Sequence, residues 1–480
     1  MNQTPAAGTA HDRRPATDEG TAPRDLRARV VRVLQTRPLL VAAIVLVLGS
    51  LLASTAHVRY YSQLSPVDEL QHIDYLYKAP DVVRNGETVD QEAMREEACR
   101  TLPNYPAPPC SETTTYEPDD FQEFGINTAA IYTPLYYSVT KLVAAPLQWV
   151  TGMDSLVTAG RLVGGLWLAG GLVMTLLVAR RFGAHPYPTA GLLLAAAVTP
   201  NVLLPSATIT PDAAALLAGA ALVWSVLWWE ERPSRRLWLP VLLGLAAVLL
   251  KALNVIVVVL IALYVVLRLV QRAWWPADAP GEGRPRRLPG VPATGPTVGQ
   301  TAVLVVVCSA LALAGAVGYV LFSAANAVPS DDQAMSELQA SAFPLRPMVE
   351  HVGVFLQVFY SPGWWVTVPV LGPLVQSVLG LVVFAGTFAA ALLTDRVPRA
   401  ARTMATSLLV VGLVGAPLII AFSYISQGVY VPIPGRYALT LVPAGLAVTA
   451  AAATRRPAQV VLGLGGLAMY AVVVGWLLVS

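Results

Sequence analysis

Charged side chains are scarce in this chain: only 13% of its 480 residues are Asp, Glu, Lys or Arg. Lysine is rarest, with only Lys78, Lys141 and Lys251. Hydrophobic residues make up 55%, and the mean hydropathy is +0.58. This balance excludes an ordinary soluble domain, in which about 25% of residues are charged. The sequence therefore predicts an all-α, polytopic membrane protein, for which we expect no nucleic-acid partner.

Long apolar runs predict about eleven membrane-spanning helices, within a range of ten to thirteen. A helix needs about 20 apolar residues to cross a bilayer, and most of the runs approach that length. The predicted spans are 39–56, 158–179, 187–205, 211–229, 237–250, 253–269, 300–323, 366–393, 403–423, 437–453 and 457–478.

Basic residues collect on one side of these spans. The tail 1–38, which we expect to be disordered, and the alternate inter-span segments carry 22 of the 32 basic residues. The Pro-, Gly- and Arg-rich loop 270–299 is one of these segments. The positive-inside rule then predicts a cytoplasmic N-terminus and a membrane domain over 39–480.

The segment 132–150 would invert this topology if it crossed the membrane. Its Tyr, Lys and Trp content favours a helix lying at the outer interface, and an ordinary spanning helix is the alternative.

The predicted topology leaves two long loops outside, at 57–130 and 324–365. The first is large and acidic, with 14 of the 29 acidic residues of the chain against five basic ones, and a loop of this length usually has structure of its own. Cys99 and Cys110 both lie in it, and in an oxidising compartment we expect them to form a disulfide with a structural role. Cys308 lies within a predicted span as a small buried residue.

An acidic pair, Asp68-Glu69, follows the first span in the run SPVDELQH. A carboxylate at the mouth of a membrane domain can act as a general base, and His72 would share a helical face with the pair. The alternative is purely structural, because acidic residues are also favourable in the first turn of a helix.

Other unusual polar residues fall on the same predicted outer face. Asp212, in the run SATITPDA, starts a helix, so it either caps that helix or rims a polar pocket together with Thr208. Lys251 interrupts an apolar stretch, where it either snorkels to lipid phosphate or serves a site. The turn Ser361 to Trp365 favours an interfacial anchor. Arg436, in PGRY, can clamp phosphate oxygens.

These motifs resemble a bacterial membrane-protein family of unknown function, numbered 2142. The resemblance runs from about residue 39 onward and rests on SPVDELQH, TPLYY, SATITPDA, Lys251, SPGWW and PGRY. Family members often have proline after the acidic pair and glutamine before GRY, where this chain has Leu70 and Pro434. That family in turn resembles the GT-C superfamily of membrane glycosyltransferases, which take sugars from polyprenyl phosphates.

The resemblance implies a GT-C-like enzyme of the bacterial plasma membrane. It would transfer a hexose or pentose from a polyprenyl-phosphate donor to an envelope glycan, lipid or protein, usually with inversion. Asp68 would be the general base, with Glu69 and His72 beside it, and Arg436 and Lys251 would bind the donor phosphate. Thr208, Asp212, Tyr136 and Tyr437 would contact substrate.

Two other classes of function stay open. A transporter or lipid flippase would also be polytopic, but we expect inverted repeats and broken helices in it, and the sequence has no visible repeat. A noncatalytic protein of envelope assembly is the other alternative. We expect no cofactor, although an acidic pair can bind a divalent cation.

Overall fold

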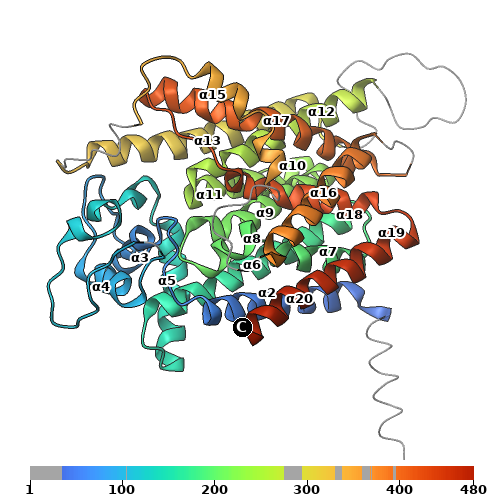
Figure 1. Ribbon diagram of the computed structural model, residues 1–480. Helices are drawn as coiled ribbons and strands as arrows, with labels where there is room; N and C mark the ends of the chain where they lie inside the picture. The colour runs from blue at the N-terminus through green and yellow to red at the C-terminus, as the bar shows by residue number, and fades with distance from the viewer. Residues whose placement is uncertain are drawn as a thin grey trace, which may run out of the picture.

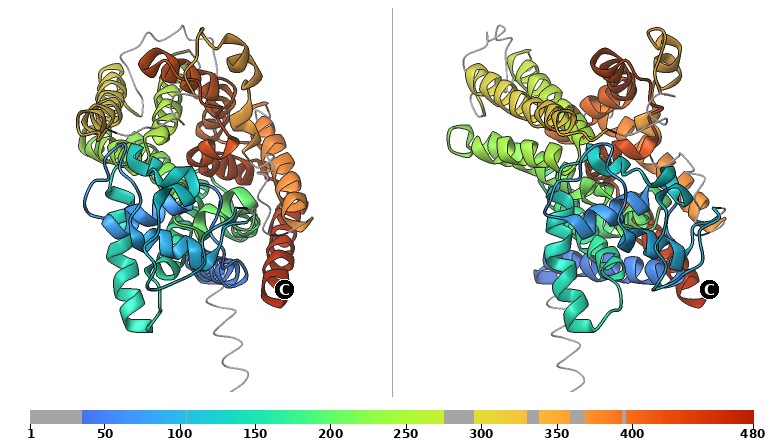
Figure 2. Two further views of the ribbon diagram at one scale, coloured as in Figure 1. Left: turned by 60° about the vertical axis from the view of Figure 1, so that its left-hand side comes forward. Right: turned by 90° about the vertical axis from the view of Figure 1, so that its left-hand side faces the viewer.

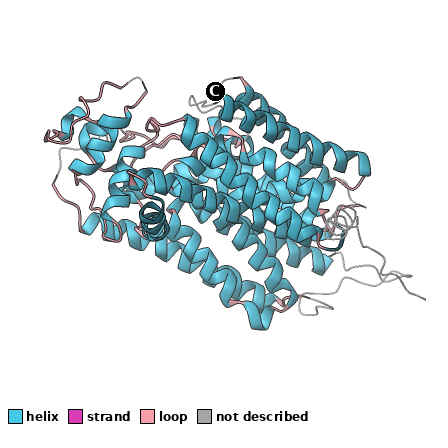
Figure 3. Cartoon of the chain, turned by 90° about the horizontal axis from the view of Figure 1, so that it is seen from below, coloured by secondary structure: helices cyan, strands magenta, loops and turns pink. Residues whose placement is uncertain are grey.

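The computed structural model describes residues 35–274 except 104, residues 295–329, 338–358, 368, 370–392 and 396–480. Within this part of the chain every regular element is a helix, and the only β-type pairings are isolated bridges (Figure 3). The prediction of an all-α protein is therefore confirmed.

Eight helices in the described ranges are long and apolar enough to cross a membrane. They are built from α2 (Pro38–Tyr60), α6 (Leu156–Arg181), α9 (Ala215–Glu231), α12 (Val255–Trp274), α13 (Val298–Ala325), α16 (Leu371–Leu392), α17 (Arg399–Gln427), and the pair α19 (Arg456–Val460) and α20 (Gly466–Val479). These helices make the chain a polytopic membrane protein.

The structure does not support the predicted count of eleven spans, because three of the predicted runs are short or broken helices. The run 187–205 contains α7 (Pro186–Ala197), then the single turns α8 (Pro200–Leu203) and η4 (Pro205–Ala207). A proline lacks the amide hydrogen that a continuing helix needs, so Pro200 and Pro205 interrupt it.

The other two runs are also shorter than a bilayer requires. The run 237–250 forms α11 (Trp238–Leu250), and 13 residues span only about 20 Å. The run 437–453 begins as the 3-10 helix η8 (Gly435–Leu441), and only α18 (Val442–Ala452) is α-helical. A membrane-crossing segment can still contain such pieces where they pack against other helices.

Residues 61–134 form a folded unit at one end of the helical bundle, seen in blue at the left of Figure 1 and facing the viewer in the right view of Figure 2. We call it the loop domain. It contains α3 (Glu69–Lys78), α4 (Gln91–Arg100) and three short 3-10 helices. Its apolar cluster is separate from the main core of the bundle and continues onto α5 (Leu135–Thr151), the start of α6 and the chain near Ile209.

The helix α5 is not one of the eight candidate spans. Its outward face carries exposed apolar side chains, with Leu142 75% and Trp149 84% exposed. An amphipathic helix of this kind is suited to the membrane interface. The position of α5 relative to a membrane stays a prediction.

Basic ends of several helices meet at the far end of the bundle from the loop domain. Arg181, from α6, and Arg236, just before α11, both pair with Glu231 at the end of α9. Across the same end, the Thr403 hydroxyl on α17 donates to Gln271 Oε1 on α12 at 3.0 Å. The bundle thus has a basic end, where these arginines lie, and an acidic end, formed by the loop domain. The predicted topology requires such a difference between the two ends. Which end faces the cytoplasm stays a prediction.

Small residues let the broken segments pack closely against the long helices. A Cβ on Gly219 of α9 would lie 2.0 Å from the Thr440 carbonyl oxygen in η8, and one on Gly164 of α6 would lie 2.4 Å from the Ser206 carbonyl oxygen. Only glycine allows backbones to approach this closely. These two contacts fix η8 and the 205–207 turn against the bundle.

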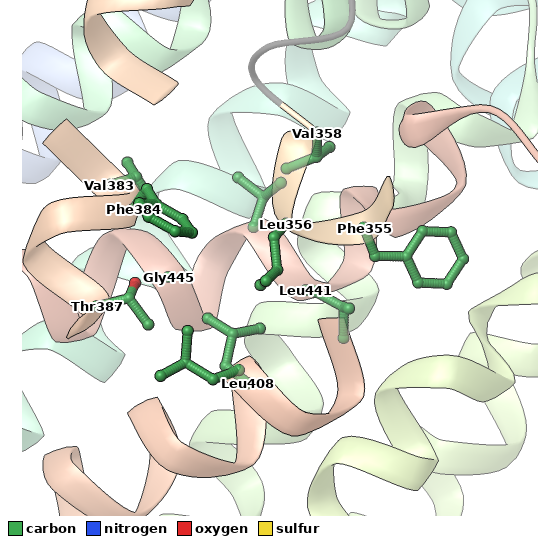
Figure 4. Close-up of a pocket in the computed structure, with 11 residues that line it drawn as sticks. Phe355, Leu356, Val358, Val383, Phe384, Thr387, Leu408, Leu441 and Gly445 are labelled. Atoms are coloured by element: carbon green, nitrogen blue, oxygen red, sulfur yellow. The ribbon is translucent and has the colours of Figure 1, made fainter. Parts of the chain in front are cut away.

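A small apolar cavity of about 30 Å³ lies beyond η8, between α16, α17 and α18 (Figure 4). Its walls include Phe384, Leu408 and Leu441. This volume is enough for about one water-sized probe and too small for a sugar. The candidate site must therefore be sought where polar groups meet.

Candidate functional site

Three interruptions of the helical bundle supply the polar residues of the site. Asp212 lies in the 3-10 helix η5 (Pro211–Ala214) before α9. Lys251 follows α11 and precedes the single turn η6 (Ala252–Asn254), and Arg436 lies in η8. Backbone that leaves the helical pattern can direct side chains into a bundle, so each break adds one charged group to the same place.

Asp212 joins the two cationic side chains. The Lys251 ammonium forms an ion pair with Asp212 Oδ1, and Arg436 Nε lies 3.9 Å from Oδ2 of the same carboxylate. Lys251 is only 3% exposed, so it does not snorkel to lipid. The Thr210 hydroxyl accepts a bond from the Asp212 backbone N–H at 3.4 Å. Because Thr210 caps this turn, the Asp212 carboxylate is available for the ion pairs.

Two tyrosine rings line the cations. The Lys251 Nζ lies 4.4 Å from the Tyr437 ring centroid and 5.8 Å from that of Tyr132. The Arg436 Cζ is 5.6 Å from the Tyr437 ring. Ring faces attract cations at these distances, so the tyrosines help to hold both charges without neutralising them.

Asp68 faces this group from the loop domain. It occupies the N-cap position of α3 with φ 55°, in the left-handed region, but its carboxylate makes no capping hydrogen bond. Asp tolerates this conformation better than most residues. Burial raises the pKa of Asp68, and the charges of Arg436 and Lys251 oppose that rise while Asp212 adds to it. These couplings show that Asp68, Asp212, Lys251 and Arg436 share one electrostatic environment.

Glu69, the other half of the acidic pair, has a full set of partners. Arg161 donates to it twice, from Nε to Oε1 at 2.9 Å and from Nη2 to Oε2 at 2.7 Å. Both side chains are essentially inaccessible to solvent. The backbone N–H of Ser65 and that of Ile209 donate to the remaining positions at 2.6 and 3.0 Å. Glu69 therefore ties the loop domain to α6 and to the turn before η5, and has no free oxygen for an acceptor.

His72 is buried between the acidic pair and the tyrosines. Its Nδ1 lies 2.7 Å from the Tyr137 hydroxyl, and its ring centroid is 5.5 Å from that of Tyr132. Burial, followed by the charge of Lys251, lowers the pKa of His72 to about 3. The imidazole is therefore neutral at physiological pH. Its role is to position Tyr132 and Tyr137 rather than to carry charge.

Thr208 and Tyr136 stabilise the turn that carries Asp212. The Thr208 hydroxyl donates to the Leu204 carbonyl at 2.9 Å, and the Tyr136 hydroxyl accepts from the Thr210 backbone N–H at 3.3 Å. Thr208 is 4% exposed and Tyr136 is fully buried. Of the four residues expected to contact substrate, only Asp212 and Tyr437 lie directly at the cationic group.

The remaining predicted residues lie elsewhere. Cys99 and Cys110 are bonded, with their Cα atoms 4.5 Å apart, and Cys308 is a buried free thiol. The turn Ser361 to Trp365 lies outside the described residues. No group of three or more His, Cys, Asp or Glu side chains suited to a metal ion occurs in the ranges that the structure describes.

Unused N–H donors in the site suit an anion. Lys251 and Arg436 share a single carboxylate, which leaves one positive charge uncompensated by Asp212. The buried Arg436 Nε has no hydrogen-bond partner among the described residues. A guanidinium and an ammonium with unused donors bind phosphate well. Asp68 adds a carboxylate at the edge of this anion site.

A comparison with known protein families gives a match over most of the chain. The family is described as "Predicted membrane protein (DUF2142)", and its model matches residues 78–474. The chain belongs to this family. The match includes Asp212, Lys251 and Arg436 and begins after the acidic pair. No curated protein and no solved structure matches the chain.

Two residues that build the site were not predicted from the sequence. Arg161 is the only charged residue in the run 158–179, and an isolated charge in a span usually has a buried partner. That signal could have identified it. Tyr132 carries no such signal, because its place beside Lys251 depends on how the chain enters α5. Tyr75 and Tyr319 hydroxyls both donate to the Tyr132 carbonyl and hold it there.

Proposed function

We propose that this protein is a membrane glycosyltransferase that transfers a sugar from a polyprenyl-phosphate donor to an acceptor of the cell envelope. The observation that carries the proposal is the placement of an unpaired carboxylate, Asp68, against a cationic pair, Lys251 and Arg436, in one buried environment. A transfer from a lipid phosphate needs a base and an anion site side by side.

Asp68 is the proposed general base. Among the described residues its carboxylate has no hydrogen-bond or ion-pair partner, whereas Glu69 is fully bonded. A base must be free to accept a proton from the attacking hydroxyl. The acceptor oxygen then bonds to the anomeric carbon of the sugar as its proton passes to Asp68.

Lys251 and Arg436 are the proposed ligands of the donor phosphate. When the bond between the anomeric carbon and the phosphate oxygen breaks, the electron pair stays on polyprenyl phosphate, whose charge increases. Fixed cations that meet the developing charge lower the barrier to this step. Asp212 and Tyr437 hold the ammonium and the guanidinium in place.

The orientation of the site also fits a lipid-linked donor. The cations lie at the loop-domain end of the bundle, next to the helix breaks, and the predicted topology puts this end outside. A polyprenyl phosphate keeps its tail among the helices and its head group at that interface. The proposal includes the plasma membrane as the location of the protein and a molecule of the cell envelope as the acceptor.

The test uses the purified protein in liposomes that contain radiolabelled polyprenyl-phosphate hexoses or pentoses, supplied singly with envelope acceptors. We expect Asp68→Asn to lower transfer by about 10²- to 10⁴-fold, the usual contribution of a general base. The exposed Asp81→Asn is the matched control and should transfer normally. Full transfer by Asp68→Asn would exclude Asp68 as the base.

A transporter or lipid flippase is the second candidate, and the three helix breaks favour it. Interrupted helices form substrate sites in many transporters. Here the breaks collect near the loop domain rather than repeating in two halves, which favours the enzyme. The same liposomes separate the two functions: movement of the lipid-linked sugar between leaflets without formation of a glycosylated product would support transport. Absence of both activities would favour a noncatalytic role in envelope assembly.

A further inference from the structure

Four buried carboxylate and amide oxygen atoms in the loop domain have no hydrogen-bond partner among the described residues. They are Gln71 Oε1, Gln122 Oε1 and both carboxylate oxygens of Glu97. The Gln71 and Glu97 side chains are 0% exposed. A buried oxygen without a donor costs free energy, and a buried charge without a counter-charge costs more.

Gln122 connects the three side chains. Its backbone carbonyl accepts from Gln71 Nε2 at 3.3 Å, and its backbone N–H is turned toward the Glu97 carboxylate. The two amide orientations are fixed by their nitrogens. Gln122 Nε2 donates to the Pro66 carbonyl at 3.0 Å, and Gln71 Nε2 donates to Gln122, so exchanging nitrogen and oxygen would lose both bonds.

No described cation compensates Glu97. Burial raises the pKa of Glu97 to about 7, and only the Gln122 backbone N–H opposes that rise. Asp120 and Glu123 act together with Glu97 on the nearby Tyr105, so the surroundings are negative. Such a field attracts a cation toward these buried oxygens, which lack hydrogen-bond donors.

We propose that Glu97, Gln71 and Gln122 form a calcium site in the loop domain. Carboxylate and amide oxygens are the ligands that Ca²⁺ prefers, and its flexible coordination of six to eight oxygens leaves positions for water. One carboxylate with two neutral oxygens is a weakly charged set. We expect such a set to bind Ca²⁺ with a Kd of about 10⁻⁴ to 10⁻³ M, as extracellular calcium-binding modules do.

The site would act on the segment that carries Asp68. The Gln122 side chain donates to the Pro66 carbonyl, and Gln71 lies in the first turn of α3, two residues after Glu69. An ion that joins α4 to these two side chains fixes residues 66–71 relative to the rest of the loop domain. This stabilising role holds whether or not the protein transfers sugar.

The test measures calcium binding by the full-length protein in detergent, with ⁴⁵Ca²⁺ in equilibrium dialysis and thermal unfolding in EDTA or CaCl₂. We expect about one ion per chain and a higher midpoint of unfolding in calcium. Glu97→Gln should abolish both effects. Glu92→Gln, on the exposed face of the same helix, is the matched control and should retain them.

The variant itself should fold, because Glu97→Gln removes a buried charge and is expected to be at least as stable as the native chain in EDTA. Three results would overturn the proposal. They are no saturable binding by the native chain, unchanged binding by Glu97→Gln, or stabilisation of the native chain in EDTA at pH 5 relative to pH 7.5 that calcium cannot reproduce. The last result would show that Glu97 takes a proton instead of an ion.

Discussion

Asp68 and Glu69 are neighbours in the sequence and have opposite environments. Glu69 is enclosed by Arg161 and two backbone amides, whereas Asp68 is partly buried and interacts with the two cations only through their charges. The left-handed backbone at Asp68 separates the two side chains. One acid therefore stabilises the fold, and the other is available for chemistry.

The two acids should give different results on substitution. Glu69→Gln leaves Arg161 as an uncompensated buried charge, so we expect it to lower the free energy of unfolding by about 3–5 kcal/mol. Asp68→Asn should leave it nearly unchanged. Thermal or denaturant unfolding of the purified variants measures both, and a double variant with Arg161→Met should lose less than the two single losses added. Equal stability of the native chain and Glu69→Gln would contradict the structural role.

The pH dependence of transfer should report on Asp68. Burial raises its pKa, so activity should fall on the acid side at a pH above the usual value of about 3.8 for an aspartate. Arg436 opposes that rise, so Arg436→Gln should move the acid limb to still higher pH as well as weakening donor binding. Initial rates between pH 4 and 8 measure this. A shift to lower pH would show that Arg436 does not act on the base.

At the scale of elements, the site depends on where helices stop. Prolines at 200, 205 and 211 interrupt the helical structure before α9. The 3-10 helix η8 takes the place of the first turns of α18. The sequence indicates the prolines, but it does not show that η5, η6 and η8 meet. The hydropathy prediction counted 187–205 and 437–453 as whole spans, because hydropathy averages over a break of a few residues.

Close packing of η8 against α9 should be essential to the site. Gly219→Ala would place a methyl group 2.0 Å from the Thr440 carbonyl oxygen, which requires η8 and its Arg436 to move. We expect a loss of about 1–3 kcal/mol in stability and a lower transfer rate. Gly475→Ala, where a Cβ meets nothing within 4 Å, is the matched control and should be neutral or slightly stabilising. Native behaviour of Gly219→Ala would show that η8 can shift freely.

At the scale of the whole molecule, the loop domain and the basic helix ends lie at opposite ends of the bundle (Figure 1). Surface cysteines can test which end is outside. Asp81→Cys in the loop domain should react with a membrane-impermeant maleimide in intact cells, whereas Arg456→Cys should react only after permeabilisation. Both positions are exposed. The reverse pattern would place the proposed site in the cytoplasm and exclude an extracytoplasmic acceptor.

The sequence by itself determined the class of protein, the helical architecture and most of the charged residues of the site. Hydropathy is a local property, and a lone Lys251 or Arg436 in an apolar chain is visible without coordinates. Only the tertiary structure decided which charges are paired. Asp212 to Lys251, Asp212 to Arg436 and Glu69 to Arg161 join residues that are 39 to 224 positions apart, and such contacts depend on how helices pack. The division of the acidic pair into one structural and one available carboxylate follows from that packing.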